Sequence, residues 1–144
     1  MRLDLYQAET ERLVREQTTM MAEARQKLQN KEGLSALEQA GVLHALQILI
    51  ENAIGKAKNI LKATEGPVPI SAYDAFASLK RMGAMNAEEY SQWSSAIGIR
   101  NRIVHEYMNL NIELILNLVK TERYSFIVNF LEKKMDAKVS NHER

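Results

Sequence analysis

The sequence predicts an all-α fold, an antiparallel helical bundle of four long helices and one short helix. The chain has 144 residues and is 46% apolar, enough for one domain with its own core. It has only six glycines and two prolines, and apolar residues recur at spacings of three and four along most of its length. Both features favour helices, and the breaks between the periodic segments set their number.

The first two helices are separated by a short polar break. Residues 3–29 form the first predicted helix, and residues 30–33 end it. Ser35 and Glu38 have the spacing of a capping box, so a second helix begins there and runs to about Ala63. Its apolar stripe comprises Leu43, Leu46, Ile50, Ala53, Ile54, Ala57, Ile60 and Leu61.

Two prolines, Pro67 and Pro69, separate the second helix from a short third one. Proline lacks the backbone donor and restricts the residue before it, so the helix cannot continue. Ser71 is the expected N-cap of the third helix, and Gly83 stands where a C-terminal glycine belongs.

The remaining segments complete the bundle. Asn86 is a good N-cap for a fourth helix that runs into residues 100–107, and Asn111 can cap a fifth helix that ends near Lys134. Residues 1–135 are therefore expected to form a single domain, with residues 136–144 as a polar C-terminal tail.

Composition argues against several classes of function. Nineteen basic and eighteen acidic residues leave a net charge of +1, which argues against a large non-specific nucleic-acid grip. The chain has no cysteine, no Glu-x-x-His pair and no glycine-rich phosphate loop, so neither a metal nor a cofactor is expected. No apolar run reaches membrane-spanning length, and a cytoplasmic protein is the default expectation.

The residues from Arg100 to Tyr107 carry the chemistry. Arginine offers fixed donors for a phosphate, histidine can move a proton near neutral pH, and tyrosine is a modifiable hydroxyl. On an ideal helix, Arg100 and Tyr107 lie within about 20° of one face, whereas Arg100 and His105 are about 140° apart. Arg100 and His105 can still form one site in two ways. Either the helix distorts or ends near His105, or a homodimer brings two copies of the motif together.

The pattern Arg-x4-His-x-Tyr, with Asn101 after the arginine and an apolar pair before the histidine, resembles the active-site motif of HEPN-domain ribonucleases, specifically HepT-like toxins. The resemblance covers roughly residues 40–131 and includes residues 46–53 and 69–76. It implies a HEPN-like bundle that acts as a homodimer and cleaves RNA without a metal, with Arg100 and His105 as catalytic residues. Asn101 and Glu51 are supporting candidates.

The same resemblance implies a partner. A HepT-like chain would be the toxin of a toxin–antitoxin pair, and its antitoxin would be a minimal nucleotidyltransferase (MNT) that transfers AMP from ATP to Tyr107. The added phosphodiester would bring negative charge beside Arg100 and His105 and so compete with an RNA phosphate.

Other interpretations of these residues remain open. Arg100 and His105 could serve as a helix-end cap and an ion pair with Glu106 or Glu51, and Tyr107 could be a half-buried aromatic residue. The whole chain could be a non-catalytic HEPN-like substrate-binding or adaptor partner of a nucleotidyltransferase. It could also be a plain helical-bundle adaptor in which the motif is incidental.

Overall fold

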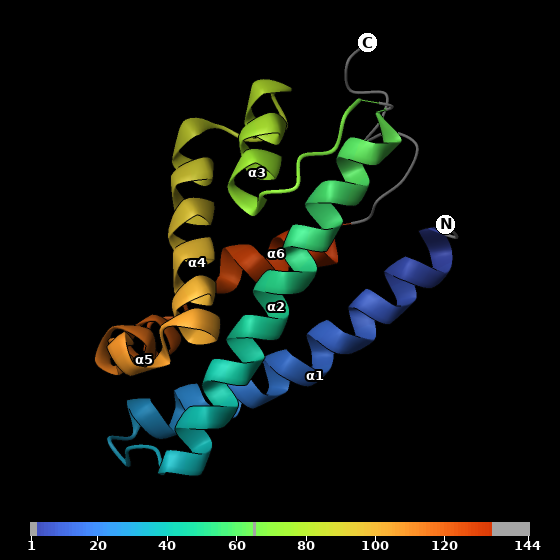
Figure 1. Ribbon diagram of the computed structural model, residues 1–144. Helices are drawn as coiled ribbons and strands as arrows, with labels where there is room; N and C mark the ends of the chain where they lie inside the picture. The colour runs from blue at the N-terminus through green and yellow to red at the C-terminus, as the bar shows by residue number, and fades with distance from the viewer. Residues whose placement is uncertain (1–2, 65, 134–144) are drawn as a thin grey trace.

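Six α-helices and one 3-10 turn make up the computed structural model of the protein, which describes residues 3–64 and 66–133 (Figure 1). The all-α prediction is confirmed for these residues. The long helices are α1 (Leu3–Gln29), α2 (Ala36–Ala63) and α4 (Ala87–His105). The shorter elements are α3 (Ala72–Arg81), the 3-10 turn η1 (Tyr107–Asn109), α5 (Ile112–Lys120) and α6 (Ser125–Glu132). The predicted tail, residues 136–144, lies outside the described residues.

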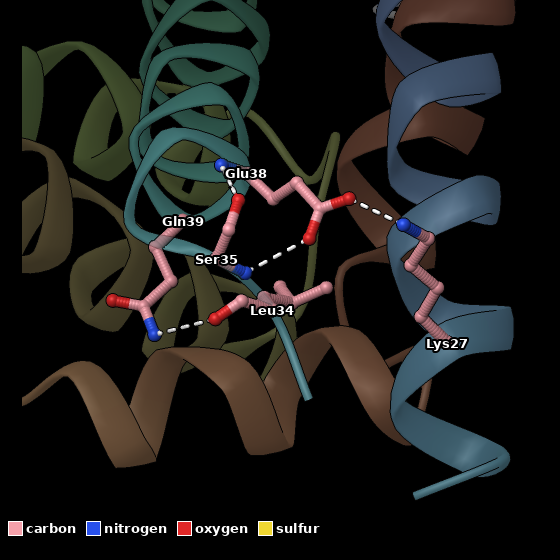
Figure 2. Close-up of polar contacts among 5 residues, drawn as sticks. All are labelled: Lys27, Leu34, Ser35, Glu38 and Gln39. Atoms are coloured by element: carbon pink, nitrogen blue, oxygen red, sulfur yellow. Dashed lines mark hydrogen bonds and ion pairs between the residues drawn. The ribbon is translucent and has the colours of Figure 1, made fainter. Parts of the chain in front are cut away.

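The α1–α2 hairpin is fixed by polar contacts at its turn (Figure 2). Ser35 Oγ accepts a hydrogen bond from the Glu38 backbone N–H at 3.1 Å, and Glu38 Oε1 accepts one from the Ser35 N–H at 2.8 Å. This is the capping box that the sequence predicted. The other carboxylate oxygen of Glu38 pairs with Lys27 of α1, and this hydrogen bond holds the pKa of Glu38 below its ordinary value. One glutamate therefore both caps α2 and joins it to α1.

Helix α2 lies at the centre of the molecule, where it contacts α1, α3, α4 and α6 (Figure 1). All eight residues of its predicted apolar stripe are buried. On one side of α2, an aromatic cluster joins α3, α4 and α6: Phe76 stacks on Trp93 with ring centroids 4.5 Å apart, and Phe130 meets Trp93 edge-on at 5.1 Å. Such pairs contribute beyond the apolar area that they bury.

The ends of α3 and α4 follow the sequence signals. Ser71 accepts a hydrogen bond from the Asp74 N–H at 3.2 Å at the start of α3. Gly83 has φ of 83° directly after the C-cap, a left-handed conformation that glycine adopts without strain. Asn86 and Glu89 then form a second capping box at the start of α4. Arg100 and His105 lie at the opposite, C-terminal end of α4.

The prediction of one long last helix was wrong. Residues 121–124 form a turn that separates α5 from α6, and Glu122 has φ of 60°. The Arg123 N–H donates to the Leu118 carbonyl at 2.9 Å, which is the hydrogen bond that closes a helix end around a left-handed residue. Tyr124, the last residue of the turn, is buried, and Arg25 of α1 pairs with Glu122 at 3.6 Å. Tertiary contacts thus accompany a break that no glycine or proline announces.

A buried lysine fastens the end of α6 to α2. Lys56 is only 2% exposed, and its Nζ donates to the Phe130 carbonyl at 2.6 Å and to the carbonyls of Leu131 and Lys133. The last carbonyls of a helix lack partners within the helix, so the ammonium acts as their cap. Burial, together with the charge of Lys133, lowers the pKa of Lys56 to about 8.

Candidate functional site

The C-terminal two turns of α4 carry Arg100 and His105. The helix stays regular as far as His105, and the Glu106 N–H still donates to the Arg102 carbonyl at 2.9 Å. Glu106 then leaves the helical conformation, with φ of −137° and ψ of 44°. Ile97 and Ile103 are buried and hold this end of α4 against the core. The backbone that carries the motif is therefore fixed by packing.

Arg100 is half-buried, and one nitrogen of its guanidinium, Nε, has no partner among the described residues. Its Nε is buried without a hydrogen-bond partner, and within residues 3–64 and 66–133 no carboxylate lies within ion-pair distance of its guanidinium. The ion pair with Glu51 or Glu106 that a purely structural role would require is therefore not formed between these residues. A buried donor without a partner is unfavourable and needs an explanation. A phosphate ligand would supply one.

His105 is the last residue of α4, and its side chain is exposed. Because α4 remains a regular helix up to this residue, the angle of about 140° between Arg100 and His105 around the axis persists. The helix does end here, but it ends after the histidine and does not bring it closer to Arg100. Within one chain the two side chains point to different sides of α4.

Tyr107 lies outside the helix, in the turn η1, and is 57% exposed. The expectation that Tyr107 shares a helix face with Arg100 was wrong, because α4 stops two residues before the tyrosine. The expectation of a half-buried aromatic was wrong too. Val104 and Met108 beside it are also exposed, and Met108 reaches 93%. The end of α4 thus presents an accessible phenol within a small apolar surface.

Within the described residues, neither supporting candidate forms a side-chain hydrogen bond or an ion pair with Arg100 or His105. Glu51 is half-buried on α2, where it accepts a hydrogen bond from Gln47 at 3.2 Å. Asn101 is half-buried on α4. Nothing in this geometry tests their supporting roles, which stay predictions.

Two clefts lie between α4 and the α5–α6 segment, whose backbones are not in close contact within the described residues. The first has a volume of about 310 Å³ and lies directly beside the motif. Its lining residues are Ile99, Arg102, Asn109, Leu110, Asn111, Leu114 and Ile115. The second cleft, of about 360 Å³, continues past Ile99 toward the start of α4, as far as Glu88. The sequence did not predict either cleft, because each is formed by residues of separate helices.

Two further findings concern metals and membranes. Within residues 3–64 and 66–133, no three His, Asp or Glu side chains gather where they could hold a metal ion. In the same part of the chain, every helix is too short or too polar to cross a bilayer.

Comparison with known proteins agrees with the resemblance seen in the motif. Residues 14–133 match the family model described as ribonuclease HepT-like. No curated protein matches the sequence. Among solved structures, a tri-AMPylated Shewanella oneidensis HEPN toxin in complex with an MNT antitoxin superposes with a TM-score of 0.68 at 20% identity, covering 90% of this chain and 96% of that one.

A second solved structure, a toxin–antitoxin complex with AMP-PNP, superposes with a TM-score of 0.62 at 18% identity, covering 83% of this chain and 97% of the other. At these identities the two likenesses establish a shared fold, here the HEPN-like helical fold.

Proposed function

Because the chain belongs to the HepT-like ribonuclease family, we propose that it is a metal-independent endoribonuclease toxin that acts as a homodimer in the cytoplasm. An MNT-type nucleotidyltransferase antitoxin inactivates it by transferring AMP to Tyr107. The observation that carries the proposal is the end of α4. There, within the family-matched region, Arg100 keeps a buried Nε without a partner and His105 is exposed.

The reaction requires proton transfers that histidine can perform. A general base takes the proton from the RNA 2′-hydroxyl, whose oxygen then attacks the adjacent phosphorus. The bond to the 5′-oxygen breaks, and a general acid gives that oxygen a proton. The products are a 2′,3′-cyclic phosphate and a free 5′-hydroxyl. Arg100 stabilises the charge that develops on the phosphate oxygens.

A second copy of the chain supplies what one chain lacks. One His105 cannot act as base and acid in the same step, and in one chain it points away from Arg100. Two copies of α4 facing each other would place two histidines and two arginines around one phosphate. The exposed apolar side chains of Val104 and Met108 beside the motif favour such an association, because burying them stabilises a dimer.

Tyr107 is the proposed site of inactivation. Its hydroxyl is accessible in η1, so its oxygen can attack the α-phosphorus of ATP and displace pyrophosphate. Each AMP attached adds roughly one negative charge. That charge lies two residues from His105, where it would compete with an RNA phosphate for Arg100. The HEPN toxin of Shewanella oneidensis, which shares the fold, carries three AMP groups in its complex with an MNT antitoxin.

The proposal is tested by cleavage of RNA with purified protein in the presence of a chelator. Arg100→Ala and His105→Ala should each reduce cleavage by about a hundredfold or more, the scale of losing a general acid–base or a charge-stabilising donor. The products should end in 2′,3′-cyclic phosphate.

Matched controls come from exposed residues elsewhere. Arg81→Ala on α3 and His44→Ala on α2 remove the same side-chain types and should leave cleavage unchanged. Sedimentation should give a dimer for all variants. Full activity of His105→Ala, or an absolute need for a divalent metal, would refute the nuclease mechanism.

A further inference from the structure

The cleft of about 310 Å³ beside the motif is lined by four apolar residues and three polar ones. The apolar residues are Ile99 of α4, Leu110 before α5, and Leu114 and Ile115 of α5. Arg102 precedes His105 by three residues, so the two side chains are neighbours on one side of α4. Whatever occupies this cleft therefore lies about one helical turn from the catalytic histidine.

The polar lining residues are Arg102, Asn109 and Asn111. The Asn111 side-chain oxygen caps α5 by accepting a hydrogen bond from the Leu114 N–H at 3.1 Å. That cap fixes the orientation of the amide and leaves its NH₂ group as the available donor. Arg102 carries only donors, and within the described residues it makes no ion pair. Two of the three polar lining residues thus have N–H donors available for a ligand.

We infer that this cleft binds one nucleobase of the RNA, next to the cleaved phosphate, and that it prefers the keto bases uracil and guanine. The inference rests on the proposed ribonuclease function and adds a specificity site to it. The flat face of a base fits against leucine and isoleucine side chains, and single-stranded RNA exposes its bases for such contacts. Uracil and guanine present carbonyl oxygens to the donors of Arg102 and Asn111, whereas cytosine and adenine present an amino group at the equivalent position.

The size of the cleft agrees with this occupant. Small-molecule sites begin at about 300 Å³, combine apolar walls with a few fixed polar groups, and bury most of their ligand. A single base with part of its ribose is a ligand of this class, whereas a second helix is too large.

Asn111→Asp tests the inference without removing the cap of α5. Aspartate keeps the oxygen that accepts from Leu114 N–H and is a favourable N-cap, but it replaces the NH₂ donor with an acceptor. The wild type should cleave oligonucleotides that carry uracil beside the scissile bond about tenfold or more faster than those with cytosine, and Asn111→Asp should abolish or reverse that ratio. Arg102→Ala should lower kcat/KM for the uracil substrate more than for the cytosine substrate.

Asn117→Asp provides the matched control, since it introduces the same charge at an exposed position of α5 that does not line the cleft. It should leave the uracil-to-cytosine ratio unchanged. Equal ratios in the wild type, or the same loss of preference in Asn117→Asp and Asn111→Asp, would overturn the inference.

A binding measurement separates failure of this inference from failure of the proposed function. In the His105→Ala dimer, methyl NMR signals of Leu114 and Ile115 should shift when a uracil-containing oligonucleotide is added, and less with an abasic one. These shifts need no catalysis. Their absence would refute the base site even if cleavage occurs, and their presence without cleavage by the wild type would refute only the nuclease.

Discussion

The buried amine of Lys56 should make the free energy of unfolding rise with pH above about 8. Its pKa is about 8 in the folded protein, whereas an unfolded lysine titrates near 10.4. Between these values the unfolded chain binds more protons than the folded one, so stability increases with pH. Over the interval from about pH 7.5 to about pH 9.5 the gain amounts to about 2 kcal/mol, from 1.36 kcal/mol for each pKa unit of difference.

The upper limit of the pH window is set by a different group. Burial raises the pKa of Tyr124, so its phenol stays protonated in the folded state when it begins to ionise in the unfolded chain. As the unfolded tyrosine ionises near pH 10, the folded state therefore binds more protons at this residue, which opposes the gain from Lys56. The rise in the free energy of unfolding should therefore weaken at about that pH.

Urea unfolding at a series of pH values measures this effect, with two variants for comparison. Lys56→Met keeps a similar side-chain volume but cannot titrate, so its stability should lack the rise. Lys62→Met changes an exposed lysine of the same helix and should follow the wild type. If the wild-type and Lys56→Met curves run parallel from about pH 7.5 to 9.5, the lowered pKa of Lys56 is refuted.

Three further changes test the regulation and the local structure. Tyr107→Phe should remain folded and dimeric but accept no AMP from the MNT partner and ATP, as mass spectrometry can measure; AMP on Tyr73, Tyr90 or Tyr124 instead would contradict the assignment. Asn86→Ala removes the α4 cap and should lower the free energy of urea unfolding by about 1 kcal/mol, whereas Asn117→Ala should change it little. Glu122→Gly and Glu122→Val both lose the ion pair with Arg25, so the difference between their stabilities reports the cost of the left-handed backbone conformation. The glycine variant should be more stable by about 1–2 kcal/mol. Equal melting curves would exclude a left-handed residue at this position.

Apolar periodicity and capping residues predicted most of the fold because both act locally. The α2 stripe is buried as expected, and the caps at Ser35, Ser71 and Asn86 all form. The same periodicity failed in the last helix for a definable reason. Val119 and Phe126 are seven residues apart, so the apolar pattern continues in register across the turn that separates α5 from α6. The break lies in a non-glycine left-handed residue, Glu122, which pairs with Arg25 of α1.

Lys56 was overlooked because charged residues are usually solvent-exposed. It follows Ala53 and Ile54 and precedes Ala57, on the buried side of α2. Its partners are carbonyl groups more than seventy residues away in sequence, at the end of α6. Only the packing of α6 on α2 makes the position suitable for a cation, and a local pattern cannot carry that information.

In the candidate site, too, some features depend on local sequence and others depend on tertiary packing. Arg100 and His105 could be proposed from the sequence because their chemistry depends on residue type and on spacing along one helix, and their catalytic roles stay predictions. The position of Tyr107 depends on where α4 ends. Ideal helix geometry placed it on the same face as Arg100, but α4 ends at His105 and Tyr107 lies in η1. The proposed base cleft could not be predicted in this way, since Arg102 lines it from α4 and Asn111 lines it from the cap of α5. A motif along one helix can therefore suggest a phosphate-binding residue, but a cleft between two helices can be proposed only after both helices have been placed in space.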